Sequence, residues 1–182
     1  MSLEEYLILN RQALVLKPVF TGENLTEIIT IQGSYFSKLS ISELLNRACL
    51  YFYSTMKGRM DATKKLFGYL RKPPFLIWED FGVFPVISPT RRECIWVFSN
   101  FSTAKAVGPE QTLLTYTDNF SVEVPVSLHV IKRQKYRVHM LLSHAKHSLI
   151  HKTPNPEHEK AWIEYYEKLI LVDEEIPPHD NT

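Results

Sequence analysis

Residues 40–78, SISELLNRACLYFYSTMKGRMDATKKLFGYLRKPPFLIW, decide the fold class because they pass from helical to strand patterning. Ser40 and Glu43 have the spacing of a capping box, and apolar residues recur at helical intervals after them. We therefore expect a helix over residues 42–56 that is interrupted by Gly58.

The second half of this stretch predicts a short helix followed by a strand. Residues 60–67 can resume the helix, and Gly68 stands where a helix C terminus is expected. After Pro73-Pro74, the apolar run of residues 75–78 is typical of a strand. Helix and strand thus follow each other directly.

On both sides of residues 40–78, runs rich in apolar and β-branched residues predict further strands. These runs are 5–10, 13–18 and 26–32 before the stretch, and 83–87, 94–98, 112–116 and 121–126 after it, the last two as a hairpin around Asp118-Asn119. Ser127 is the expected N-cap of a long amphipathic helix with basic residues on one face. Asn155-Pro156 begins a predicted C-terminal helix, and the acidic tail 173–182 is expected to be disordered.

The irregular order of helices and strands favours an α+β fold with mixed, mainly antiparallel sheet elements over a doubly wound sheet. With 182 residues and 45% apolar content, residues 1–172 are predicted to form a single domain. Cys49 and Cys94 are flanked by apolar residues, which favours buried, reduced thiols in an intracellular protein. No apolar run approaches the roughly 20 residues of a membrane span.

Charge is segregated along the chain although the net charge is only +1. Residues 57–72 hold six Lys/Arg and one Asp, and residues 127–156 hold six Lys/Arg and no acidic residue. Residues 157–182 hold two basic and eight acidic residues. The two basic islands indicate either a phosphate-binding surface or ordinary solvated faces.

Motifs of enzymes and cofactor sites are absent from the sequence: it has no GxSxG, GxxxxGK[ST], HExxH or CxxC. We therefore expect no catalysis and no cofactor. His144, His147 and His151 have spacings that place them along one helix face, which fits a metal site or histidines that interact with the helix end. Nearby lysines disfavour a divalent cation, so no metal is expected.

Several short motifs in register resemble the ComK family of bacterial competence transcription factors. They are RACLYF at 47–52, GRMDAT at 58–63, KPP at 72–74, FP at 84–85 with Ser88, Thr90, Arg91, Cys94 and Trp96, and EVPVS at 123–127. The likeness covers about residues 4–150. It implies a cytoplasmic, nucleoid-associated activator of competence genes that binds AT-rich boxes through the minor groove, bends the duplex, and assembles as dimers or dimers of dimers, with RNA polymerase as a further possible partner.

This resemblance makes the basic residues candidates for DNA contact. Arg59, Arg91 and Arg92 are the expected groove readers, because narrow A·T minor grooves attract positive side chains. The expected phosphate contacts are Lys57, Lys64, Lys65, Arg71 and Lys72 in the first island and Lys132 and Arg133 on the basic helix.

Two further points qualify the resemblance. Residues 152–159 lack the apolar cluster that an adaptor recognises in well-known members of the family, which argues against adaptor-controlled proteolysis here, although residues 162–166 could supply another recognition element. The competing hypothesis is a protein-interaction or scaffolding module, whose basic islands would engage an acidic partner or the acidic C-terminal segment of a second copy.

Overall fold

The computed structural model describes residues 1–150, 160 and 163–164. The chain divides into two compact units, residues 1–145 and 146–182, and the fold described below is that of the first. The predicted C-terminal helix and the predicted disordered tail fall largely or wholly outside the described residues. The single-domain boundary at residue 172 stays a prediction.

A six-stranded antiparallel sheet, sheet A, forms the middle of the first unit. Its strand order is β3-β2-β1-β6-β5-β4. The strands are β1 (Val15–Pro18), β2 (Thr26–Thr30), β3 (Gly33–Ser37), β4 (Phe75–Trp78), β5 (Phe81–Pro85) and β6 (Trp96–Phe98). The register places Val15 opposite Ile29 on one side and Val97 on the other, so apolar side chains stack across the sheet.

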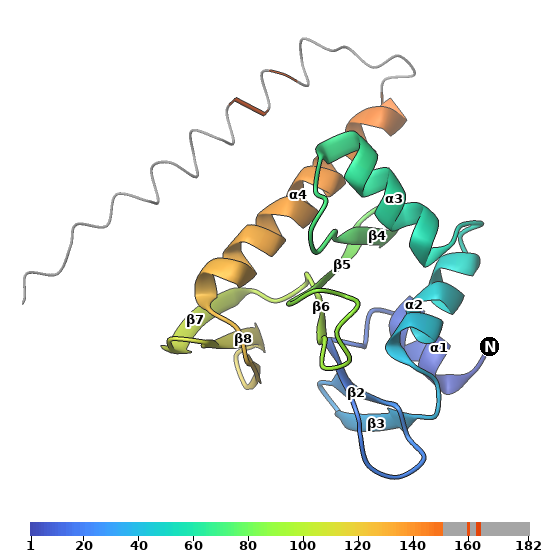
Figure 1. The fold of residues 1–182 in the computed structure, drawn as a ribbon, viewed down its shortest axis with the longest axis vertical. Coiled ribbons are helices and arrows are strands. Elements are labelled where there is room, and N and C mark those ends of the chain that lie inside the picture. Colours follow the sequence, from blue (N-terminus) through green and yellow to red (C-terminus); the bar gives the residue numbers. More distant parts are fainter. Residues whose placement is uncertain (151–159, 161–162, 165–182) are drawn as a thin grey trace, which may run out of the picture. The chain divides into compact units, whose positions relative to one another are not determined.

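Both faces of sheet A are covered, and alternate residues of its strands enter two different cores. One core joins the sheet to helices α1 (Leu3–Leu9), α2 (Ile41–Leu50) and α3 (Met56–Phe67). The other joins it to the long helix α4 (Leu128–Ile150) and to a second sheet. Figure 1 shows α1 to α3 on one side of β4–β6 and α4 on the other.

The second sheet, sheet B, is a three-stranded antiparallel meander of order β7-β8-β9. Its strands are β7 (Thr103–Gly108), β8 (Gln111–Thr117) and β9 (Phe120–Val124). Leu114, Val122 and Val124 carry the core side of this sheet, and Tyr116 donates its hydroxyl to the Leu14 carbonyl at 2.9 Å. Sheet B is thus fastened to sheet A, and α4 follows it directly.

The α+β class and the mainly antiparallel sheets predicted from the sequence are confirmed. The capping box at Ser40 is also confirmed: Glu43 N donates to Ser40 Oγ at 3.3 Å, and Ser40 N donates to Glu43 Oε2 at 2.9 Å. Gly68 ends α3 with φ of 68°, and the predicted helix after Ser127 is α4.

Two expectations were wrong, and two strands were not predicted. Residues 5–10 are not a strand, because Ser2 and Glu5 form a second capping box that starts α1. Gly58 does not interrupt the helix but lies in the first turn of α3, whose N-cap Thr55 accepts from Gly58 N at 3.0 Å. The break comes earlier, at residues 51–55. Strands β3 and β7 carry many exposed positions and therefore lack the apolar runs that predicted the others.

Candidate nucleic-acid interface

The two basic islands meet where the loop after α3 crosses α4. Arg137 Nη1 donates to the Arg71 carbonyl at 2.9 Å, and Gln134 Nε2 donates to the Lys72 carbonyl at 3.0 Å. Gln134 is buried and also donates to the Pro85 carbonyl at 2.7 Å, which ties the loop to sheet A. We call Lys72, Arg133 and Arg137 the cationic cluster, together with Arg71, whose backbone carbonyl Arg137 binds.

Burial and neighbouring positive charges both disfavour the charged forms of residues in this cluster. Burial lowers the pKa of Lys72, and the neighbouring Arg137 and Arg133 lower it further. Burial likewise lowers the pKa of Arg137, with a second contribution from Arg133. None of the salt bridges within the described part of the chain includes a member of the cluster. Within the described residues, the cluster therefore concentrates positive charge without an ion-paired carboxylate, which suits an anionic ligand.

Aromatic rings of the loop after α3 pack against the Arg137 side chain and α4. The Arg137 guanidinium lies 4.7 Å from the Tyr69 ring centroid, within the range of a cation–π contact. Tyr69 stacks on Phe67 with centroids 5.6 Å apart, and Phe67 meets the His144 ring edge-on at 5.3 Å. The loop after α3 is thereby fixed to α4 by rings as well as by hydrogen bonds.

The lysines of α3 have different surroundings. Lys57 and Lys64 both pair with Asp61, with Nζ–carboxylate distances of 2.6 Å and 3.3 Å. Lys65 is exposed. A surface ion pair of this kind contributes little stability and breaks readily, so these lysines remain available to phosphates. Their predicted contacts with DNA stay predictions.

Arg59 points toward the protein interior. Its Nη1 donates to the Leu76 carbonyl at 2.7 Å and its Nη2 to the Phe52 carbonyl at 3.5 Å. The expectation that a turn at Gly58 projects this side chain outward was wrong, because Gly58 is helical. The predicted groove contact stays a prediction, but the geometry favours a structural role that joins α2, α3 and β4.

Arg91 and Arg92 lie in the exposed loop between β5 and β6. Arg91 pairs with Glu93, and the Arg92 guanidinium lies 5.5 Å from the centroid of the exposed Phe20 ring. Lys72 Nζ donates to the Val86 carbonyl at 3.5 Å, at the root of this loop. Lys72 therefore links the cationic cluster to the loop between β5 and β6.

The basic face of α4 is divided between two roles. Lys132 and Arg133 are exposed, as a phosphate-binding face requires. Lys135 instead donates to the Phe101 carbonyl at 2.7 Å and lies 4.0 Å from the centroid of that ring. Burial lowers the pKa of Lys135, which fits a structural lysine beside sheet B.

Sequence reasoning missed Arg137 and Tyr69, which connect the two islands. The spacing of Arg133 and Arg137 by four residues places them on one helix face, and this signal was present in the sequence. No comparable signal marked Tyr69, because only the path of the chain after Gly68 brings its ring under α4.

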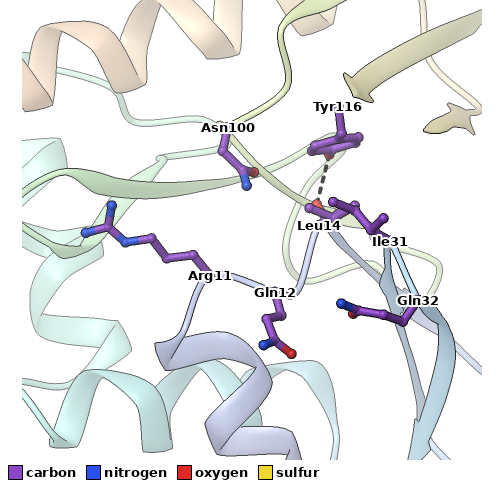
Figure 2. A pocket seen from close by; sticks show the side chains of 7 residues that line it. All are labelled: Arg11, Gln12, Leu14, Ile31, Gln32, Asn100 and Tyr116. Carbon is purple, nitrogen blue, oxygen red and sulfur yellow. Dashed lines mark hydrogen bonds between the residues drawn. The ribbon is translucent and has the colours of Figure 1, made fainter. Parts of the chain in front are cut away.

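Other kinds of site have little support. The hollow in Figure 2, of about 160 Å³, is lined mainly by Arg11, Gln12, Gln32, Asn100 and Tyr116, and Arg11 pairs with Asp80. It is smaller than typical small-molecule pockets. Among the described residues, no three His, Cys, Asp or Glu side chains are placed to hold a metal ion, and His151 lies outside them. Nor does the described part contain a helix of the length and apolarity that crossing a membrane requires.

Comparison with known proteins gives two matches. The sequence model of the ComK protein family matches residues 3–149. The competence transcription factor of Bacillus subtilis (strain 168) is 24% identical over 155 residues, which cover 84% of this chain and 81% of that protein. No solved structure matches the chain.

Proposed function

The chain belongs to the ComK family, and from this membership and the cationic cluster we propose that it is a competence transcription factor that binds AT-rich double-stranded DNA. Its relative in Bacillus subtilis carries that description. The family match includes every basic residue of α3, the following loop, the β5–β6 loop and the part of α4 that holds the cluster. We infer that regulation, and not catalysis, is the role of this chain.

One observation carries the proposal: Lys72, Arg133 and Arg137 are packed together and form no salt bridge within the described part of the chain. Bringing like charges together costs free energy unless an anion offsets them. A duplex backbone supplies closely spaced phosphates, and each neutralising contact releases counterions. Binding of DNA would thus relieve the repulsion within the cluster.

The proposed division of labour follows the exposure of each side chain. The cationic cluster, together with the exposed Lys65 of α3 and Lys132 of α4, contacts phosphates and sets the position of the protein on the duplex. Arg91 and Arg92, on the neighbouring exposed loop, enter the narrow minor groove of an A·T-rich segment, whose negative potential attracts guanidinium groups. Sequence preference then comes from groove width more than from base-edge hydrogen bonds.

The direct test measures binding of the full chain to AT-rich and GC-rich duplexes of equal length by fluorescence anisotropy at several salt concentrations. We expect tighter binding to the AT-rich duplex and a steep loss of affinity with salt. Arg133→Ala should weaken binding to both duplexes and reduce the slope of log K against log salt by about one unit. Arg91→Ala combined with Arg92→Ala should instead reduce the preference for the AT-rich duplex.

Lys105→Ala is the matched control, because Lys105 is an exposed lysine on β7 outside the cluster. It should leave the affinity and the salt slope unchanged within the error of measurement. Equal affinity of the wild-type protein for both duplexes would reduce the proposal to nonspecific polyanion binding. Absence of binding to either duplex, together with binding of an acidic peptide, would favour a protein-interaction module.

Assembly and location belong to the same proposal. The protein binds paired boxes as a dimer or a dimer of dimers, contacts RNA polymerase at its promoters, and is associated with the nucleoid in the cytoplasm. Sedimentation velocity with and without a duplex that carries two boxes tests the assembly state. Monomers in both samples would contradict the proposed assembly. The segment 152–159, on which the doubt about adaptor-controlled proteolysis rests, lies outside the described residues.

A further inference from the structure

Leu70 is an apolar residue placed among cations. Leu70 is 73% exposed, more than any other leucine, isoleucine or valine in the described residues. It stands between Tyr69, which lies under Arg137, and Arg71, whose carbonyl Arg137 holds. An exposed leucine on its own needs no explanation, but this one lies within the strongest concentration of positive charge described above.

The loop that carries Leu70 is fixed by hydrogen bonds and by a cation–π contact with α4. Gly68 and Lys72 at its two ends have positive φ angles of 68° and 51°, and Leu70 N donates to the Gly68 carbonyl at 2.9 Å. The residues on either side of Leu70 are bound to α4 through the Tyr69 ring and through the carbonyls of Arg71 and Lys72. Leu70 is therefore the solvent-exposed tip of a braced turn and not part of a loose loop.

From this placement we infer that Leu70 inserts between two base pairs of the bound duplex from the minor groove. The inference rests on the proposed function. Proteins of the minor groove use apolar side chains such as Leu, Ile, Met or Phe as wedges that unstack a base step and kink the duplex. The cations beside the tip would bind the phosphates that flank the opened step, and the braced loop would prevent the wedge from folding back.

Physical reasoning favours DNA as the occupant over an apolar protein surface. A protein partner would have to bury the leucine together with Arg71 and Lys72, and buried charges without carboxylate partners are costly. Polyanionic phosphates compensate those charges, while pyrimidine–purine steps of an A·T-rich site open easily to admit the side chain. A DNA duplex can therefore both neutralise Arg71 and Lys72 and accept the apolar Leu70 side chain.

The test uses the full chain and a set of AT-rich duplexes in which 2-aminopurine replaces one adenine at a time. Unstacking raises the fluorescence of this base, so wild-type protein should brighten one step strongly and the others little. Leu70→Ala should abolish that increase, reduce the bend measured by circular-permutation gels, and lower affinity about tenfold. Leu70→Met should retain the increase, because methionine is also a wedge residue.

Leu66→Ala is the matched control, since Leu66 is an exposed leucine, at 59%, in the last turn of α3. It should behave as wild type, and thermal unfolding should show that all variants are folded. If wild type binds the duplex but Leu70→Ala gives the same fluorescence and bend, the wedge is wrong and the proposed function stands. If wild type does not bind AT-rich DNA, the proposed function fails and this inference fails with it.

Discussion

At the scale of single residues, the role of an arginine depends on which atoms surround its guanidinium. Arg59 donates to the carbonyls of Leu76 and Phe52, whereas Arg133 is exposed. Arg59 also lies beside the buried Cys49 thiol, whose pKa is raised to about 11 mainly because it is buried. Arg59 thus has a structural environment, whereas Arg133 remains open to solvent.

Substitution of Arg59 should therefore affect stability. Arg59→Ala removes charge-assisted hydrogen bonds to two carbonyls and should lower the free energy of unfolding by about 2 kcal/mol. Lys64→Ala should change it by less than about 0.5 kcal/mol, because Lys64 takes part in a surface ion pair. Urea unfolding followed by circular dichroism measures both. Wild-type stability of Arg59→Ala would contradict the structural role and favour the predicted groove contact of this residue.

At the scale of elements, α1 and α2 share a hydrophobic core, and one carboxylate adds polar contacts between them. Glu5 accepts from Ser2 N at 2.9 Å, from Tyr51 Oη at 3.3 Å and from Arg47 Nη1 at 3.5 Å. These contacts lower the pKa of Glu5, the hydrogen bond from Ser2 most of all, against the opposing effect of burial. A seven-residue helix that is too short to be stable alone is thereby fixed to its neighbour.

Lowering of the Glu5 pKa predicts how stability depends on pH. The folded state favours the carboxylate, so its contribution is present above the unfolded pKa of about 4.3 and is lost as pH falls through the lower folded value. Glu5→Gln should reduce the free energy of unfolding by about 1 kcal/mol at pH 7, and the difference should shrink at pH 3. Urea titrations at the two pH values measure this.

The control for this experiment is Glu110→Gln, at an exposed position between β7 and β8. It should give a small difference at both pH values. A difference between wild type and Glu5→Gln that is the same at pH 3 and pH 7 would show that the charge of Glu5 has no part in joining α1 to α2.

The packing of α4 on sheet A also depends on one position. A Cβ added at Gly82 of β5 would lie 2.3 Å from Val138 Cγ1 of α4, far inside van der Waals contact. Gly82→Ala should therefore lower the free energy of unfolding by about 2 kcal/mol through overpacking. With Val138→Ala, which opens the space, the double variant should lose less than the sum of the single variants. Additive losses in thermal unfolding would mean that the two residues do not meet.

At the scale of the first unit, sheet A separates two cores, and the cationic cluster lies at its α4 side. The core with α1 to α3 fixes Arg59 and the start of α3. The core with sheet B and α4 sets the helix face that bears Arg133 and Arg137. Because the loop after α3 spans from one layer to the other, binding at the cluster should depend on the integrity of both cores.

DNA binding should accordingly stabilise the protein as a whole. A ligand that binds only the folded state at a hundred times its dissociation constant adds about 2.7 kcal/mol to the free energy of unfolding. An AT-rich duplex should raise the melting temperature of wild type, and a GC-rich duplex at the same concentration should raise it less. Arg133→Ala should reduce both shifts. A duplex that leaves the melting temperature unchanged would contradict binding to the folded state.

Local sequence patterns were enough to predict the α+β class, the Ser40 capping box, the end of α3 at Gly68, the long α4 and the two basic islands. These features depend on local periodicity, capping and composition, which act over a few residues. The same patterns did not predict β3 and β7, whose exposed positions give no apolar run, and they missed α1, where a capping box competes with a strand-like apolar segment.

Which cations come together, and which do not, depends on how the elements pack in three dimensions. Arg71 and Lys72 are more than 60 residues from Arg133 and Arg137 in the chain, and they meet because Gln134 and Arg137 of α4 bind the loop carbonyls. Arg59 belongs to the first basic island in sequence, but its guanidinium donates to the carbonyls of Phe52, just after α2, and Leu76 of β4. The reason is that hydrogen bonds and charge repulsion depend on distance in space, and residue spacing in a sequence does not set that distance across separate elements.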